Sequence, residues 1–291
     1  LNFGSLNYDY VYSVDHILLP GETSAAWRME TFIGGKGLNQ SVALARAGAE
    51  VWHAGQVGEE GGQLLTMCRE NGVNTEYIRQ VPGKSGHTVI QVDKRGQNNI
   101  LLFGGANRSI PQDFADEVLA AFGEGDLLLL QNEINGIPRL IKNAHARGMR
   151  IVLNPSPYDE VISECDLSKV SILLVNEIEG WQISGQREPD SILEVLAHQY
   201  PELAVVLTLG SQGVVYQHQS ERFSHGIYPV PVVDTTAAGD TFTGYFLAGM
   251  TRGLSVPQSL ELASKASSIA VTRHGAAPSI PLLREVESYA F

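Results

Sequence analysis

Short apolar runs alternate with helical stretches along most of the chain, and this alternation limits the fold more than any other feature. Runs that predict buried strands lie at residues 51–57, 126–130, 150–153, 172–175 and 205–209. Apolar residues at helical spacing predict helices at 62–71, 111–122, 137–147 and 191–199. Strands that alternate with helices predict a mostly parallel sheet with helices on both faces. We therefore expect an α/β fold with three layers.

More strands are predicted outside this alternation. Residues 1–6, 8–14 and 27–33 are rich in strand-forming side chains, and residues 87–92 and 98–103 predict a hairpin. The segment after residue 33 predicts a helix that ends at Gly48, a usual position for a helix-stopping glycine.

Polar residues follow several of the predicted strands directly. These residues are Glu133, Asn154, Asn176, Glu177, Glu179 and Thr208. In open α/β sheets the ligand site lies outside the carboxyl ends of the strands. A solvated loop would account for each residue alone, whereas a shared site accounts for all of them together.

The segment from Val230 onward predicts the end of a strand and then a helix that begins near Gly239. Ala237, Ala238 and Gly239 supply little side-chain bulk at the start of that helix. The first N–H groups of a helix lack internal partners and carry the positive end of the dipole, so an anion can approach them here. We therefore predict an anion hole of phosphate-like dimensions.

Asp240 follows this predicted anion hole directly. Its carboxylate can take a proton from a hydroxyl while the hole holds the negative charge that develops, which suits phosphoryl transfer to an alcohol. A helix-capping role for Asp240 is the alternative on this segment alone, because Asp is a favoured capping residue.

A glycine cluster at Gly34, Gly35 and Gly37 predicts a second site. Lys36 is followed by Gly37, so the cluster is not a P-loop, which requires Ser or Thr after the lysine. Glycines permit close backbone approach to a ligand, and the Asn39 amide can both donate to and accept from a sugar hydroxyl. A plain glycine turn before a helix is the alternative. No dinucleotide-binding fingerprint follows a strand, which argues against a dehydrogenase.

Composition excludes several other classes of protein. The net charge of −12 argues against nucleic-acid binding, and 43% hydrophobic residues suffice for a large core. The two cysteines, Cys68 and Cys165, are expected to be buried thiols. We expect no membrane span and no signal peptide, hence a cytoplasmic protein, and we expect a few residues to precede Leu1 because the chain opens inside a predicted strand.

Two sequence motifs resemble the signatures of the ribokinase-like (PfkB) carbohydrate kinases. They are Gly34-Gly35-Lys36-Gly37-Leu38-Asn39-Gln40 and Asp234-Thr235-Thr236-Ala237-Ala238-Gly239-Asp240-Thr241-Phe242-Thr243-Gly244. The resemblance covers essentially the whole chain. It implies one domain over residues 1–291, with a three-layer α/β/α core and a small β-sheet lid formed by about residues 8–33 and 86–104. It further implies ATP-dependent phosphorylation of the primary hydroxyl of D-ribose, giving ribose 5-phosphate.

The resemblance also assigns roles to particular residues. It implies that Asp240 is the catalytic base and that the anion hole consists of Ala237, Ala238 and Gly239. The implied sugar-binding residues are Asn7, Asp9, Gly35, Lys36, Gly37, Asn39, Glu133 and Asp240. The implied ATP-binding residues are Asn176, Thr208, Leu209, Gly210, Ser211, Gln212, Gly213, Gly239 and Ser264. A monovalent cation such as K⁺ is implied at Asp234, Thr236, Ala270, Arg273, Gly275 and Ser279, and Mg²⁺ is implied near Glu179 through water.

The family resemblance implies a small-molecule sugar and ATP as partners, and a second copy of the chain bound through the lid. A kinase of a fructose-like sugar or of a nucleoside is the nearest alternative, because Tyr8, Trp27 and Phe103 could stack on a base if they lined the lid. A sugar sensor without activity is a further alternative, although the intact Asp240 argues against it. The chain departs from the family pattern at Tyr8, Leu38, Ser264 and His274, which bear on the sugar and adenine contacts.

Overall fold

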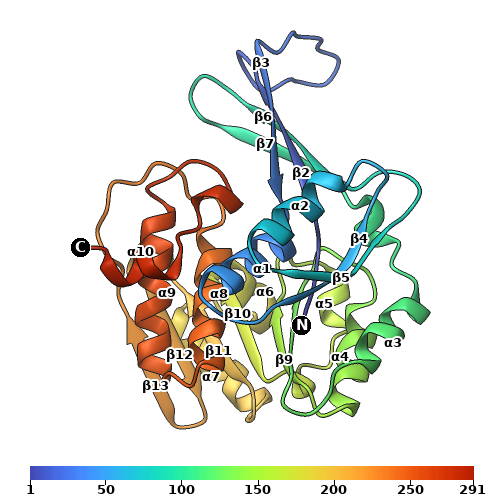
Figure 1. Ribbon diagram of the computed structural model, residues 1–291. Helices are drawn as coiled ribbons and strands as arrows, with labels where there is room; N and C mark the ends of the chain where they lie inside the picture. The colour runs from blue at the N-terminus through green and yellow to red at the C-terminus, as the bar shows by residue number, and fades with distance from the viewer.

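The computed structural model describes residues 1–291 and contains two separate sheets (Figure 1). The larger sheet consists of β1 (Asn2–Phe3), β4 (Trp52–Val57), β5 (Asn74–Gln80), β8 (Leu127–Gln131), β9 (Arg150–Asn154), β10 (Ile172–Asn176), β11 (Ala204–Thr208), β12 (Val214–His218) and β13 (Glu221–His225). The smaller sheet consists of β2 (Asn7–Ser13), β3 (Arg28–Gly34), β6 (Gly86–Val92) and β7 (Asn98–Phe103).

The helices are α1 (Lys36–Arg46), α2 (Gly62–Glu70), α3 (Gln112–Ala120), α4 (Ile137–Ala146), α5 (Glu160–Ser163), α6 (Glu177–Ser184), α7 (Pro189–Gln199), α8 (Ala238–Thr251), α9 (Val256–Ala270) and α10 (Leu283–Ser288). Short 3₁₀ turns lie at Gly105–Arg108, Leu167–Lys169, Gly210–Gln212 and Ala277–Ser279. No helix is both long and apolar enough to cross a membrane. Cys68 and Cys165 are buried free thiols, as predicted.

The strand order of the large sheet places a crevice between β1 and β8. The order is β13-β12-β11-β10-β9-β8-β1-β4-β5, and all neighbouring pairs are parallel except those that involve β12. The chain first runs outward from β1 through β4 to β5, and then returns to β8 and continues in the opposite direction. A parallel sheet opens a crevice at such a reversal, outside the carboxyl ends of the two strands. Ser5 follows β1 and Glu133 follows β8, so both lie at this crevice.

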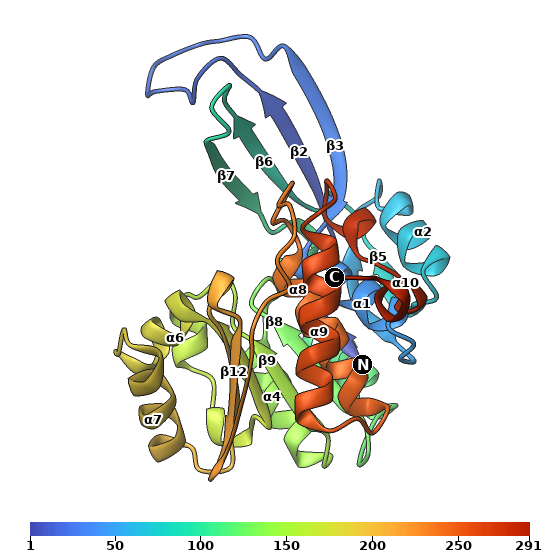
Figure 2. The same ribbon diagram turned by 90° about the vertical axis from the view of Figure 1, so that its left-hand side faces the viewer.

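Two hydrophobic cores confirm the predicted three-layer architecture (Figure 2). One core lies between the sheet and α1, α2, α8 and α9, and it contains Tyr245 and Phe246. The other lies between the opposite face of the sheet and α3, α4, α5 and α7, and it contains Phe114. Strands such as β8 are apolar on both faces because both faces are covered.

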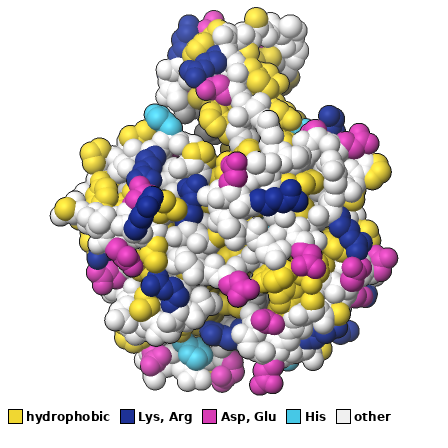
Figure 3. Space-filling view, viewed as in Figure 1, with side chains coloured by type: hydrophobic (Ala, Val, Ile, Leu, Met, Phe, Trp, Pro, Cys, Tyr) yellow, Lys and Arg dark blue, Asp and Glu magenta, His cyan; other side chains and the backbone are white.

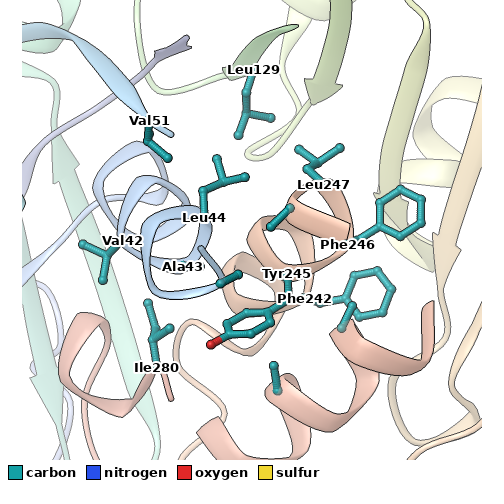
Figure 4. Close-up of a cluster of buried hydrophobic side chains, with 14 of the residues drawn as sticks. Val42, Ala43, Leu44, Val51, Leu129, Phe242, Tyr245, Phe246, Leu247 and Ile280 are labelled. Carbon is teal, nitrogen blue, oxygen red and sulfur yellow. The ribbon is translucent and has the colours of Figure 1, made fainter. Parts of the chain in front are cut away.

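Helices α1 and α8 make direct backbone contact within the first core (Figure 4). A Cβ atom at Gly244 would collide with Ala43, so only glycine allows this approach. Val42 and Leu44 of α1 and Phe242, Tyr245 and Phe246 of α8 extend the contact into the core. The Tyr245 hydroxyl donates a hydrogen bond to the carbonyl of Pro281, 2.7 Å away. This packing holds the starts of two helices, and the motifs they carry, in one fixed arrangement.

The small sheet projects from the body of the protein, with strand order β3-β2-β6-β7 (Figures 1 and 2). Side chains alternate between its faces, so Asn7 and Asp9 share one face of β2 while Tyr8 lies on the other. Tyr8 is 4% exposed and donates a hydrogen bond to the carbonyl of Glu60, just before α2. Tyr8 therefore packs toward α2, on the face opposite Asp9.

The structure corrects several predicted elements. The segment 230–233 is not a strand but an irregular segment, in which Pro229 and Pro231 remove the N–H groups that a strand would need. The first strand is only Asn2–Phe3, shorter than predicted. Strands β5, β12 and β13 were not predicted; β12 and β13 are two antiparallel strands that extend the sheet beyond β11.

Candidate active site

The first turn of α8 carries backbone N–H groups that have no hydrogen-bond acceptor in the protein. The N–H groups of Gly239 and Asp240 have no acceptor within the chain, whereas the N–H of Ala238 donates to the carbonyl of Thr235 at 3.2 Å. Ala237 has a left-handed backbone with φ of 58°, which is uncommon for a residue with a Cβ atom. A Cβ atom at Gly239 would meet nothing within 4 Å, so open space lies beside this first turn. Free donors next to open space can receive an anion.

The Asp240 carboxylate is held by two side-chain amides from α1. Its Oδ2 accepts from Asn39 Nδ2 at 3.0 Å, and its Oδ1 accepts from Gln40 Nε2 at 2.9 Å. The residue is 7% exposed. Asp240 makes no capping bond to its own helix, so the helix-capping alternative is wrong. The carboxylate is instead fixed beside the free N–H groups.

A cavity of about 210 Å³ is lined by Asp240 and by Lys36, the only lysine that lines either cavity of the site. Its lining includes Lys36, Asn154, Asn176, Glu179, Thr235, Ala237, Ala238, Gly239, Asp240 and Thr243. Burial alone would lower the pKa of the Lys36 ammonium, but the carboxylates of Asp240, Glu133 and Glu179 outweigh burial and raise that pKa above its ordinary value. Lys36 therefore stays positively charged and lies on the anion side of the site.

Asn176 and Glu179 form a reciprocal cap at the start of α6. The Glu179 N–H donates to Asn176 Oδ1 at 2.9 Å, and the Asn176 N–H donates to Glu179 Oε2 at 3.1 Å. Asn154 also lines this cavity, and its buried Oδ1 accepts no hydrogen bond within the chain. Asn154 was noted in the sequence only as a polar residue after a strand.

A second cavity of about 560 Å³ adjoins the first at the start of α8. Thr208, Thr235, Ala238 and Gly239 line both cavities. The predicted ATP-binding residues in the larger cavity are Thr208, Gly210, Ser211, Gly213, Gly239 and Ser264. Leu209 and Gln212 do not line it, and Asn176 lies in the smaller cavity.

Most of the remaining wall of this larger cavity was not predicted from the sequence. It consists of Val214, Ile227, Tyr228, Pro229, Val230, Val232, Thr235, Ala238, Phe242, Ser267, Ser268 and Val271. Residues 230–233 were predicted to be the end of a strand, whereas the alternation of Pro229 and Pro231 with apolar residues is a signal for an irregular, extended segment. An apolar wall beside free N–H groups suits a ring system attached to phosphates.

The predicted sugar-binding residues gather at the crevice between β1 and β8, at the base of the small sheet. Glu133 Oε2 accepts from the Ser5 hydroxyl and from the Lys36 N–H. Asp9 accepts from the Thr88 hydroxyl, and Asn7 Oδ1 accepts from Asn107 Nδ2 at 2.7 Å. Burial raises the pKa of Asp9 and that of Glu133, against the opposing hydrogen bonds and, for Glu133, the charge of Lys36.

Each of the three glycines in the motif at residues 34–40 is required for a different structural reason. Gly35 has φ of 92°, a conformation that other residues rarely adopt. A Cβ atom at Gly34 would collide with the Asp9 carboxylate. A Cβ atom at Gly37 would collide with the backbone of Gly4 and Ser5, so Gly37 allows α1 to pack against the end of β1. Packing against β1 is therefore a sufficient reason for glycine at position 37.

The segment 270–279, which carries four of the predicted cation-binding residues, is hydrogen-bonded through Asp234 to the segment before α8. Asp234 Oδ2 accepts from the Gly275 N–H at 3.0 Å, and its Oδ1 accepts from the N–H and hydroxyl of Thr236. Burial would raise the pKa of Asp234, but these donors hold it below its ordinary value. The Arg273 side chain points away to Glu285, at 2.8 Å, so Arg273 offers only its backbone to this loop.

The α/β/α fold, the anion-binding helix start and the two adjoining cavities are the features of a phosphotransferase that binds a nucleotide and a second substrate. Comparison with known sequences leads to the same class. Residues 1–283 match the family model for the pfkB family carbohydrate kinases, and the chain belongs to that family. Because the match covers almost the whole chain, the family assignment applies to both cavities.

Curated relatives and solved structures narrow the class further. The chain is 33% identical to the ribokinase of Haemophilus influenzae, covering 97% of this chain and 95% of that one. It is 34% identical to the ribokinase of Bacillus subtilis, covering 98% and 96% of the two chains. A structure of Arabidopsis thaliana ribokinase complexed with ribose and ATP is similar with a TM-score of 0.89 and 31% identity, covering 99% of this chain and 98% of that chain. The protein is an ATP-dependent sugar kinase.

Proposed function

We propose that the protein transfers the γ-phosphoryl group of ATP to the primary hydroxyl of D-ribose, giving ribose 5-phosphate and ADP. One observation carries this proposal: the Asp240 carboxylate lies between the predicted sugar-binding residues and the free N–H groups that face the two cavities. The solved relative with ribose and ATP, 31% identical over nearly the whole chain, supports the choice of both substrates.

Each residue of the site has a definite part in the proposed reaction. Asp240 accepts the proton of the primary hydroxyl of the sugar while the hydroxyl oxygen bonds to the γ-phosphorus of ATP. The bond between that phosphorus and the oxygen that bridges it to the β-phosphate breaks, and ADP leaves. The N–H groups of Gly239 and Asp240 and the Lys36 ammonium stabilise the charge on the transferred group. The larger apolar cavity holds the adenosine part, and the smaller cavity holds the phosphates.

The smaller cavity also offers ligands that fit Mg²⁺, which binds oxygen atoms and keeps several waters. The carboxylate of Glu179 and the unpaired Oδ1 of Asn154 line that cavity. Bound there, Mg²⁺ would neutralise charge on the ATP phosphates. We assign Glu179 and Asn154 to hold it through water.

A monovalent cation such as K⁺ fits beside the predicted anion hole. Asp234 links Gly275 to Thr236, the residue directly before the left-handed Ala237, and carbonyl oxygens of both segments are the remaining cation ligands. A cation there would stiffen the backbone that presents the free N–H groups without touching the sugar.

The small sheet is proposed to act as a lid on the sugar and as a dimer contact. Asp9, Gly34 and Thr88 come from three of its strands and meet at the sugar-binding residues. Its outer strand β7 carries exposed Ile100, Leu101, Leu102 and Phe103, and hydrophobic side chains lie at the surface of this projection (Figure 3). An isolated small sheet with apolar residues exposed is stabilised by pairing with a second copy.

The alternative substrates, a nucleoside or a fructose-like sugar, are separated from ribose by one assay. The nucleoside alternative required aromatic side chains facing the sugar, whereas Tyr8 packs on α2 and Trp27 is exposed. We would measure ADP release with ribose, 2-deoxyribose, fructose and adenosine, and compare kcat/KM. Ribose should give the highest value; a higher value for fructose or adenosine would refute the ribose assignment and leave the kinase class intact.

A further inference from the structure

A chain of buried polar side chains runs from Asp240 into the middle of the large sheet, away from both cavities. Its members other than Asp240 are at most 2% exposed, and none of them lines either cavity. In order from Asp240 they are Gln40, Gln131, Asn2, Ser41 and His53. Buried polar groups are costly unless they are bonded, and among these five residues only Gln131 Oε1 lacks a partner. A network this nearly complete holds its members in fixed orientations.

The half of the chain nearest Asp240 consists of three side-chain amides. Gln40 Nε2 donates to Asp240 Oδ1 at 2.9 Å. Gln131 Nε2 donates to Gln40 Oε1 at 2.7 Å and to Asn2 Oδ1 at 3.0 Å. Gln131 Oε1 packs against Gly4, where a Cβ atom would collide with it. Each amide thus holds the next one in place.

The far half of the chain ends on two backbone carbonyls, which can only accept hydrogen bonds. Asn2 Nδ2 donates to the carbonyl of Gly37 at 2.7 Å and to Ser41 Oγ at 2.8 Å. Ser41 Oγ lies 2.7 Å from His53 Nδ1, and His53 Nε2 lies 3.2 Å from the carbonyl of Gly4. His53 must therefore carry its proton on Nε2, and Ser41 donates to Nδ1. Burial lowers the pKa of His53 to about 4, which agrees with a neutral ring.

These carbonyls fix the direction of every hydrogen bond up to Asp240. Because the Gly37 carbonyl only accepts, Asn2 must turn its nitrogen toward it and its oxygen toward Gln131. Gln131 must then donate, so Gln40 must accept from Gln131 with its oxygen and present its nitrogen to Asp240. If the Gln40 amide were turned over, its nitrogen would face Gln131 Nε2, and its oxygen would face Asp240 Oδ1. Neither pair can form a hydrogen bond.

We propose that Gln40 is a positioning residue for Asp240, and that the buried chain through Gln131, Asn2, Ser41 and His53 holds the Gln40 amide in its donating orientation. This inference rests on the proposed function, in which Asp240 takes the proton of the sugar hydroxyl. A donor fixed on Oδ1 aims the carboxylate at the hydroxyl whose proton it accepts in the proposed reaction. Gln40 acts through Asp240 and does not touch substrate.

The test replaces the amide with side chains of similar size. Gln40→Met removes the donor, Gln40→Glu puts a second carboxyl group beside Asp240, and Gln131→Met removes the group that orients Gln40. Gln199→Met, at an exposed position at the end of α7, is the matched control. For each protein we would measure kcat, the KM for ribose and for ATP, and the melting temperature.

We expect Gln40→Met to lower kcat by about 10- to 100-fold, on the scale of a misplaced catalytic group, with both KM values within about threefold. Gln40→Glu should lower kcat at least as far, because an ionised carboxylate at this position cannot donate to Oδ1 of Asp240. Gln131→Met should lower kcat less, because Gln40 then keeps its amide and loses only the group that orients it. Gln199→Met should leave kcat and both KM values unchanged.

A measurement that does not require turnover separates this inference from the proposed function. The ¹³C signal of the Asp240 carboxyl carbon, assigned by its loss in Asp240→Asn, can be recorded at one pH in each folded variant. Loss of the hydrogen bond from Gln40 should change its chemical shift, and a chemical shift in Gln40→Met that matches the wild type would refute the positioning role, even in an active kinase. A wild type that phosphorylates no acceptor would refute the proposed function alone, and the carboxyl chemical shift would still decide the role of Gln40. If Gln40→Met does not fold, Gln131→Met and Gln40→Glu give the same decision.

Discussion

The amide nitrogen of Asn39 lies 3.0 Å from Oδ2 of Asp240, and this hydrogen bond joins residues 201 positions apart. Asn39 lies in the first turn of α1 and Asp240 in the first turn of α8, so the two sequence motifs meet at a single carboxylate. The orientation of the carboxylate is set from outside its own helix.

Asp240→Asn should abolish most of the turnover while the protein remains folded. We expect kcat to fall by roughly 10²–10⁴, the usual contribution of a general base. The new amide nitrogen would face either Asn39 or Gln40, both donors, so the free energy of unfolding should fall by about 1–2 kcal/mol. Asp113→Asn, exposed in the first turn of α3, is the control. Turnover near that of the wild type would refute the role of Asp240 as a base.

Asp9→Ala should remove most of the discrimination between ribose and 2-deoxyribose. A site whose buried polar groups lose their partner rejects such an analogue strongly, so the wild type should prefer ribose by at least about 10² in kcat/KM. The KM for ATP should not change, because Asp9 lines neither cavity. Asp15→Ala, at an exposed aspartate after β2, is the matched control. Equal preference in Asp9→Ala and the wild type would exclude Asp9 from sugar recognition.

The sequence motifs predicted the parts of the site that depend on local patterns. Asn176 and Glu179 follow a parallel strand and begin a helix, so chain order alone placed them at the carboxyl edge of the sheet. Asp240 follows three small residues in the first turn of its helix, as the local sequence predicted. The period of two along β2 also fixes Asn7 and Asp9 on the same face and Tyr8 on the other. Such features depend on neighbours within a few residues.

The features that could not be predicted depend on contacts between distant segments. Gln40, Gln131 and Asn2 come from three elements, and nothing in their immediate sequence shows that their amides meet. Gly37 resembles a ligand-facing glycine in sequence, but the distant β1 makes it a packing residue. The strand end predicted at 230–233 is wrong because Pro229 and Pro231 lack the N–H groups of a strand, although the valines between and after them favour one.

Potassium should raise the activity of the enzyme at constant ionic strength. We expect kcat to be higher in KCl than in the chloride of a bulky organic cation, because an ion beside Asp234 would stiffen the segment that leads to Ala237. Asp234→Ala should weaken this response, whereas Asp166→Ala, at an exposed aspartate before a 3₁₀ turn on the other side of the sheet, should preserve it. A flat response of the wild type would remove the cation from the mechanism.

The free energy of unfolding should decrease when the pH is lowered from the ordinary pKa of His53 to its pKa in the native protein. Burial lowers the pKa of His53 from 6.5 to about 4, so between these values the unfolded chain binds a proton that the native protein does not. The free energy of unfolding should therefore decrease as pH falls from 6.5 to 4, by up to roughly 3 kcal/mol from this residue. Urea denaturation of the wild type and His53→Gln would measure it, with exposed His198→Gln as control. The same slope in His53→Gln would contradict the assignment.

The protein should form a homodimer through the small sheet. Leu101 on β7 is 69% exposed, and Leu101→Glu should shift the protein to a monomer because a charge would be buried in the contact. Ile178→Glu, at an exposed apolar residue of α6 outside the small sheet, should leave the dimer intact. Sedimentation at micromolar concentration would measure both variants, and a monomeric wild type would exclude this interface.

The contact between Ala43 and Gly244 has a consequence for the synthesis of the chain. A ribosome releases α1 early, but the partner that covers its apolar face, α8, emerges only near the end. Until then Val42 and Leu44 lack the contacts with Tyr245 and its neighbours that bury them in the native protein (Figure 4). Nascent chains at this stage expose hydrophobic surface and are prone to aggregate. A premature stop codon before Asp240 would therefore produce an inactive chain that is also a substrate for chaperones and proteases.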